Sequence, residues 1–227
     1  SPSSSSPPSS SSLASSSIST FSILKPFLFT TINWTASYKQ QQEKQQQQSK
    51  GEGGQEEEKG KLKKQVPYPG HPLLFTFLGE RERENGNFSG AQDHFIKANR
   101  PDLLFDLLEE WGGQEKGGGN KDLFVCRATL MFLSFGNLKD ANLFFKRYWE
   151  LMCTKEEPSP LMNFTRFLLL TLEREAHPLF KQLQEVYQPS LQRDPALTQS
   201  LATISEIYYG VKVGGGGFGD LFSALLR

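Results

Sequence analysis

Apolar residues recur at helical spacing from about residue 72 to residue 209, and this pattern limits the fold more than any other feature of the chain. The apolar segments tend to begin at proline and to end at glycine, as helices do. No stretch alternates apolar and polar residues with the period of a β-strand, so the predicted fold class is all-α. The predicted helices span residues 72–84, 88–98, 101–111, 122–135, 138–153, 160–175, 178–188 and 195–209.

Capping residues and glycines set the expected helix ends. Ser159 and Asp194 each precede a proline, so their side-chain oxygens can cap a first turn in which proline lacks an N–H that is not needed. A glycine just beyond an apolar helix can adopt the left-handed conformation that closes the last turn. The glycines at such positions are Gly86, Gly112, Gly136 and Gly210.

Residues 1–66 have a composition that predicts a disordered, low-complexity segment. A serine tract, a glutamine-rich run and a mixed-charge stretch bury too little apolar surface to offset an ordering cost of about 1–2 kcal/mol per backbone residue. Two origins stay open. A targeting segment fits the lack of acidic residues before Glu43, and a translated non-coding stretch fits the position of the first methionine, Met131. The folded domain is expected over residues 67–227, ending in a glycine-rich tail.

One internal repeat, offset by 50 residues, suggests stacked helix pairs. Its Gly-Asn pair is expected to turn the chain between antiparallel helices, and its alanine to allow close packing. The pattern resembles a tetratricopeptide-type repeat, whose usual period is about 34 residues, so an intervening helix or long loops would be needed. We predict an α-solenoid, with chance similarity in a helical bundle as the alternative. The copies are Gly86, Asn87, Phe88, Ala91, Phe95, Ala98 and Gly136, Asn137, Leu138, Ala141, Phe145, Tyr148.

Residue types that carry catalysis are not grouped in this sequence. The three histidines are scattered, and none has further ligands at metal-binding spacing on both sides. The glycine-rich segments 112–120 and 214–217 lack the Gly-Lys-Ser/Thr ending of a phosphate loop. We therefore expect a non-enzymatic protein with no catalytic, metal or cofactor site.

Charge, hydropathy and cysteine content limit which partners and which cellular compartment are expected. Lys+Arg and Asp+Glu are 25 each, so no net charge attracts nucleic acid or anionic lipid. The apolar run Phe21–Phe29 is interrupted by a lysine and a proline and falls short of the roughly 20 residues that span a bilayer, so no membrane insertion is expected. Cys126 and Cys153 fit free thiols in a reducing compartment, and the expected location is the cytosol.

Several strings in the C-terminal half resemble the Golgi-to-ER traffic protein four family, over residues 72–227. The stretch from Tyr187 to Pro195 is the most specific of them. The other segments are Leu161-Met162-Asn163-Phe164, Phe167-Leu168-Leu169-Leu170, Tyr208-Tyr209-Gly210-Val211 and Phe218-Gly219-Asp220-Leu221-Phe222. Asp122-Leu123-Phe124-Val125 and the Gly-Asn repeat around Asn137 also resemble the family, in the same order.

The resemblance implies an α-solenoid scaffold in the post-translational targeting of tail-anchored membrane proteins to the endoplasmic reticulum. In that family, N-terminal helices contact a targeting ATPase and C-terminal helices hold a ubiquitin-like partner. Residues 1–66 replace the first helix pairs here, so the resemblance does not carry ATPase binding over to this chain. A BAG-family chaperone is a further candidate partner.

The end of the chain carries the predicted partner-binding residues. A short apolar helix there is marginal alone, so it should dock on the solenoid or on a partner. Arg193 is predicted to bond helix-terminal carbonyls, with a ligand contact as the alternative. The predicted partner-binding residues are Phe218, Leu221, Phe222, Leu225 and Leu226.

A tetratricopeptide-type adaptor that grips a chaperone's C-terminal peptide is the alternative function. That activity needs a basic and amide cluster to bind a carboxylate. The candidates for such a cluster are Asn87, Lys97 and Asn137.

Overall fold

The computed structural model describes residues 11–49, 69–114, 120–152 and 157–211, and within these ranges it contains helices and no strand. The predicted all-α class is confirmed. The helices are α1 (Ser11–Ser49), α2 (Pro72–Glu84), α3 (Phe88–Lys97), α4 (Pro101–Gln114), α5 (Lys121–Ser134), α6 (Leu138–Met152), α7 (Pro160–Glu173), α8 (His177–Val186), α9 (Gln188–Leu191) and α10 (Pro195–Tyr209).

Most helix ends follow the local signals of the sequence, with two exceptions. One helix was predicted over residues 178–188, but α8 ends at Val186 and a separate short helix, α9, follows at Gln188–Leu191. The Ser159 hydroxyl oxygen accepts a hydrogen bond from the N–H of Met162 at 3.3 Å, and Asp194 caps α10 in the same way. Gly112 was predicted to end a helix, and this is wrong, because α4 continues to Gln114. The Trp111 ring packs between Phe88 and Phe124 and so holds the last turn of α4 in place.

The two Gly-Asn turns have the same geometry, which supports the repeat. Gly86 and Gly136 are left-handed, with φ of 76° and 71°. The following asparagine donates its N–H to the carbonyl five residues earlier, at 2.8 Å in one copy and 3.0 Å in the other. Each asparagine side chain then accepts from the amide three residues later and so caps the next helix. Helix α4 lies between the two copies, which explains their long spacing.

Two further turns use the same geometry without glycine. Asn99 and Glu175 have φ of 56° and 53°, and the residue after each donates its N–H to the carbonyl five positions earlier, at 3.0 and 3.1 Å. A left-handed conformation costs a residue with a Cβ about 1–2 kcal/mol, so these two turns carry strain that glycine would avoid. Glycine spacing alone therefore identifies only half of the repeated turns.

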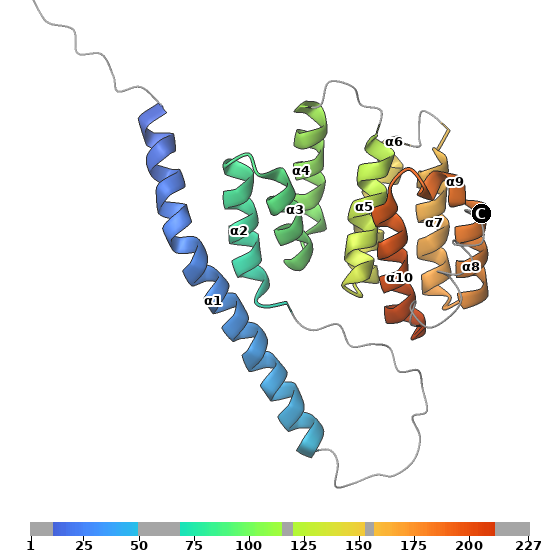
Figure 1. Cartoon of the computed structure of the whole chain (residues 1–227), viewed down its shortest axis with the longest axis horizontal. Coiled ribbons are helices and arrows are strands. Elements are labelled where there is room, and N and C mark those ends of the chain that lie inside the picture. The colour runs from blue at the N-terminus through green and yellow to red at the C-terminus, as the bar shows by residue number, and fades with distance from the viewer. Residues whose placement is uncertain (1–10, 50–68, 115–119, 153–156, 212–227) are drawn as a thin grey trace, which may run out of the picture.

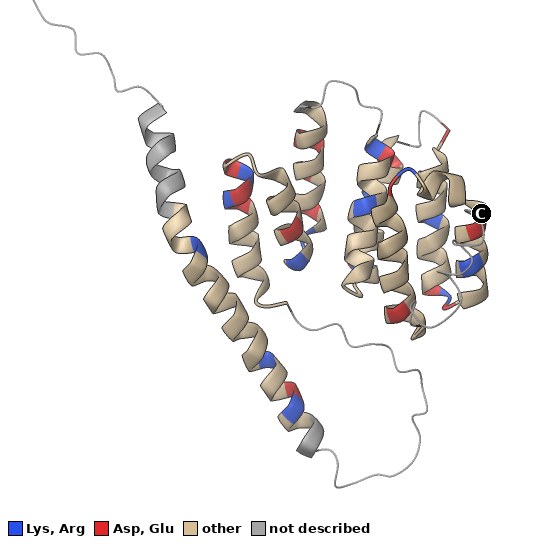
Figure 2. Cartoon of the chain, viewed as in Figure 1, with Lys and Arg blue, Asp and Glu red and all other residues tan. Residues whose placement is uncertain are grey.

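The helices stack side by side from α2 at one end to α8 at the other (Figure 1). One apolar core runs through this stack from α3 to α10. A second, smaller cluster lies at the α2 end and is formed by Phe21, Ile32, Phe75, Leu78 and Ala98. Acidic and basic residues are interspersed over the stack and form no single-sign stripe on the described helices (Figure 2).

The N-terminal segment differs from the expectation of disorder. Residues 11–49 form α1, which lies along α2, whereas residues 1–10 and 50–66 are outside the described part of the chain. The helix is ordered by tertiary contact, because Ile32 and Phe21 are buried in the small cluster against α2. Composition alone does not reveal such a contact, since a helix gains most of its stability from packing.

Candidate functional site

The predicted partner-binding residues lie outside the described part of the chain, at 218–226. The candidate site is therefore built from the described helices that precede them. The most specific stretch of the sequence, Tyr187 to Pro195, forms the end of α8, the short helix α9 and the start of α10. The ring of Tyr187 packs on Phe164 of α7, and Leu191 is buried in the core. This stretch is thus a joint between α7, α8 and α10.

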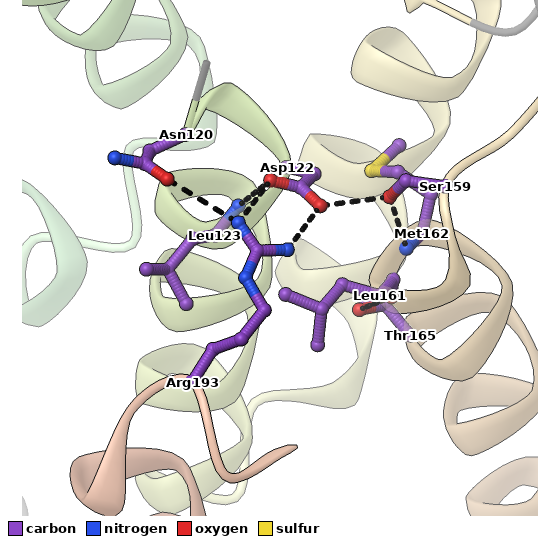
Figure 3. A network of polar contacts seen from close by, with 8 residues as sticks. All are labelled: Asn120, Asp122, Leu123, Ser159, Leu161, Met162, Thr165 and Arg193. Atoms are coloured by element: carbon purple, nitrogen blue, oxygen red, sulfur yellow. Dashed lines mark hydrogen bonds and ion pairs between the residues drawn. The ribbon is translucent and has the colours of Figure 1, made fainter. Parts of the chain in front are cut away.

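The carboxylate of Asp122 on α5 binds Arg193 of this joint (Figure 3). Both terminal nitrogens of Arg193 donate to Asp122, at 2.8 Å to Oδ2 and 3.2 Å to Oδ1. The Ser159 hydroxyl donates to the same Oδ2 at 2.9 Å, and the N–H of Leu123 donates to Oδ1 at 2.8 Å. The second arm of Arg193 also reaches Asn120 Oδ1 at 3.3 Å. One buried carboxylate therefore joins the start of α5, the start of α7 and the chain before α10.

The next residue, Asp194, forms a second ion pair with α5, and here α5 supplies the base instead of the acid. Asp194 Oδ2 accepts from Nε of Arg127, one turn along α5 from Asp122, at 2.5 Å. Its other oxygen accepts from the N–H of Ala196 at 3.0 Å and caps α10. Arg193 and Asp194, adjacent in sequence, thus pair with an acid and a base on the same helix. A shift of the joint by one residue would put like charges together, so these two pairs define its register.

The network lowers the pKa of both carboxyl groups. Burial of Asp122 opposes its ionisation, but hydrogen bonds from Arg193 and Ser159 and the arginine charge outweigh this, so its pKa lies below the usual value. For Asp194 burial is likewise outweighed by the hydrogen bonds from Arg127 and the Ala196 amide. Both groups are therefore ionised near neutral pH.

The predicted partner of Arg193 was wrong, although a structural role was favoured. The guanidinium bonds the carboxylate of Asp122 and the side-chain oxygen of Asn120 instead of a helix-terminal carbonyl. Asp122 is 71 residues away in sequence, so helix-end signals could not identify it. The sequence signals for this site were the family resemblance of Tyr187 to Pro195 and that of Asp122-Leu123-Phe124-Val125, and neither indicated that the two segments are in contact.

Large apolar side chains are exposed on α7 and on α8, which pack against each other, and these side chains are candidate contact residues for a partner. Phe167 and Leu170 are three residues apart on α7, and Leu179 and Val186 are seven apart on α8, so each pair shares a helix face. Their exposed fractions are 44%, 36%, 51% and 66%. Apolar side chains exposed on adjacent helices can serve as anchors for a protein partner. We call these four residues the α7–α8 surface.

The alternative carboxylate-binding cluster does not form. The side chain of Asn87 bonds Glu82 and the Gly90 amide. The side chain of Asn137 bonds Asn99 and Asp140, so both amides are committed to their turns. The sequence candidates therefore do not supply an open site for a peptide carboxylate.

Metal-ligating residue types are not clustered in the described part of the chain. The described residues contain no group of three histidine, cysteine or acidic side chains that could hold a metal ion. A hollow lined by Leu108, Trp111, Gly112 and Phe124 has about 170 Å³ and opens to solvent.

Cysteine and membrane predictions are tested in part. Cys126 is a free, buried thiol, and burial raises its pKa to about 12, which makes it unreactive. Cys153 lies outside the described ranges. Among the helices described, none combines the length and the apolar character needed to cross a bilayer.

Comparison with known proteins identifies relatives of the helical stack. The profile of a family described as Golgi to ER traffic protein 4 matches residues 61–226. A Golgi to ER traffic protein 4 homolog of Dictyostelium discoideum is 39% identical over 158 residues, covering 69% of this chain and 50% of that protein. Protein GET4 of Arabidopsis thaliana is 35% identical over 168 residues, covering 70% of this chain and 52% of that protein.

A solved structure shares the arrangement of helices. The crystal structure of C. therm. Get4 matches with a TM-score of 0.56 and 25% sequence identity, over 70% of this chain and 57% of that one. The chain thus spans about half the length of the curated relatives that it matches.

Proposed function

Because this chain belongs to the Golgi to ER traffic protein 4 family, we propose that it is a non-enzymatic scaffold in Golgi-to-ER traffic that serves the targeting of tail-anchored membrane proteins. The family match over residues 61–226 is the observation that carries this proposal. A stack of helix pairs also favours binding over chemistry, because it offers long surfaces to partners.

The partner that we assign to this chain is the ubiquitin-like protein of the targeting complex. Its proposed contact is the α7–α8 surface, with the apolar residues of the C-terminal tail supporting it. Asp122 with its partners Arg193 and Ser159, here called the clamp, favours such a role. The clamp fixes α7 and α8 relative to α5 and so keeps the surface preorganised. Binding would need neither ATP nor a metal.

Calorimetry with the purified ubiquitin-like partner tests this assignment. We expect the full chain to bind, and Leu179→Asp on α8 to weaken binding at least about tenfold, because a desolvated anchor contributes more than about 1.4 kcal/mol. Leu73→Asp is the matched control, since Leu73 is also exposed but lies on α2 at the other end of the stack. Equal effects of the two substitutions would refute the α7–α8 surface, and no binding by the full chain would refute the partner.

The tail is tested separately by deleting residues 214–227. Weaker binding at an unchanged melting temperature would make the tail part of the contact. Unchanged affinity with a lower melting temperature would make it a structural cap instead.

Bridging to the targeting ATPase is a weaker part of the proposal. The family match begins at residue 61, and α1 (Ser11–Ser49) lies outside it. We therefore expect the ATPase, titrated into the same chain, to bind much more weakly than the ubiquitin-like partner. Comparable affinities would contradict this expectation.

A further inference from the structure

Helix α1 contacts the stack at an end face that lies within the family-matched region, whereas α1 itself precedes that region. The face is formed by α2 and α3, and its residues Gly70, Phe75, Leu78, Glu82 and His94 all fall within residues 61–226. The contacting residues of α1 all fall before residue 50. A segment outside the family match thus fills a surface that belongs to the family domain.

The apolar part of this contact is closely fitted. Ile32 is 2% exposed and packs with Phe75 and Leu78. Gly70, with φ of 128°, lets α1 approach, because a Cβ there would lie 2.6 Å from Cγ2 of Ile32. A larger residue at position 70 would therefore force α1 away.

Polar groups fix the register of α1 on the face. The N–H of His71 donates to Thr35 Oγ1 at 3.1 Å, just before α2 begins. Near the other end of α2, Lys25 pairs with Glu82, whose second oxygen accepts from Asn87 at 2.8 Å. Burial opposes ionisation of Glu82, but the hydrogen bonds from Lys25 and Asn87 and the charge of Lys25 leave its pKa below the usual value, so the carboxylate is charged within this contact. The aromatic ring of Phe29 lies 6.1 Å from that of His94 on α3.

The stack therefore contacts one side of α1, whose residues follow a simple pattern. The pattern is a cation at position 25, an isoleucine seven residues later and a hydroxyl three residues after that, which places the three side chains on one side of a helix. The opposite side of α1 carries Ile23, Phe27 and Trp34, which are 77%, 69% and 64% exposed. Only one of the two apolar sides is used by the stack.

We propose that the α2–α3 end face is a helix-binding site and that α1 is its intramolecular ligand, which keeps the site closed. The site selects an amphipathic helix with a cation aimed at Glu82, an apolar anchor beside Gly70 and a hydroxyl that accepts from the His71 amide. Another helix with this pattern binds only when α1 has left. This inference rests on the geometry of α1 and is independent of the ubiquitin-like partner.

The test uses the full chain and two isoleucine substitutions on opposite sides of α1. Ile32→Asp buries a charge in the contact, whereas Ile23→Asp places the same charge in solvent. Amide exchange by NMR reports the contact directly, because the His71 N–H is bonded to Thr35. We expect this amide to exchange at least about tenfold faster in Ile32→Asp, since burying one isoleucine contributes more than one factor of ten, and to be unchanged in Ile23→Asp.

A labelled synthetic peptide of residues 21–46 then tests whether the face is a binding site. It should bind Ile32→Asp but neither the wild-type chain nor Ile23→Asp, and the same peptide with Ile32→Asp should not bind. Circular dichroism checks that the repeat domain stays folded, and Gly70→Ala, compared with Gly86→Ala, provides release of α1 without a buried charge.

Each outcome decides the proposal. Equal His71 exchange in the two isoleucine variants would show that α1 is not held by this face. Release of α1 without peptide binding would show that the face packs only against a tethered helix. Equal peptide binding to the wild-type chain would place the peptide somewhere else.

Discussion

Replacing Arg193 with methionine should destabilise the protein, because it removes the guanidinium of the clamp and keeps only an apolar stem in its place. Asp122 would lose two hydrogen bonds, of 2.8 and 3.2 Å, and its paired charge. Loss of one member of a fully buried pair costs about 3–5 kcal/mol, and of an exposed pair about 0–1 kcal/mol. The side chains of Arg193 and Asp122 are 37% and 11% exposed, so the pair lies between these limits. We expect a loss of about 2 kcal/mol.

Urea unfolding followed by circular dichroism measures this loss. With a shift of about 2–4 °C per kcal/mol in domains of this size, the melting temperature should fall by about 4–8 °C. Arg174→Met is the matched control, because Arg174 is exposed at the end of α7 and should change stability little. Equal losses in the two variants would refute the assigned role of the clamp.

The pH dependence gives the same prediction a second check. The folded-state pKa of Asp122 is lowered, so its contribution to stability is present above the unfolded pKa of about 3.9 and is lost as the pH falls through the folded pKa. The difference in unfolding free energy between wild type and Arg193→Met should therefore be largest above about pH 5 and shrink below about pH 4. A difference that stays constant over this range would mean that packing, and not charge, causes the loss.

Three further predictions concern the packing of the repeat, a left-handed turn without glycine, and His94 beside α1. Ala91→Leu and Ala141→Leu should each cost about 1–3 kcal/mol in urea unfolding, because both alanines are fully buried, whereas Lys139→Leu is exposed and should do little; equal, small effects would make the repeat accidental. Glu175→Gly should raise the melting temperature, because glycine relieves a left-handed φ of 53°, and a decrease would disprove the strain. His94 has its pKa lowered by burial and by nearby Lys97, so stability should fall as the pH drops below about 6.5, and His94→Gln should remove most of that slope. A slope that persists in this variant would assign the effect to another group.

The sequence by itself determined most helices of residues 72–209, but it missed the last turn of α4 and the short helix α9. Helix α10 begins at Pro195 and ends at Tyr209, as predicted, because Asp194 caps its first turn and Gly210 closes its last. These signals act within one turn of the chain, so they can be read without knowing the fold. The all-α class and the long spacing of the repeat follow from the same local information.

Only the tertiary structure decided which residues meet across the stack. Arg193 could have bonded a nearby carbonyl, but the packing of α5 against α10 brings Asp122 to it across 71 residues. Likewise, α1 is ordered because Ile32 finds Phe75 on α2, although its composition predicted disorder. Such contacts depend on the positions of distant helices, and the energy that orders or pairs a side chain comes from that neighbour rather than from the residues beside it in the chain.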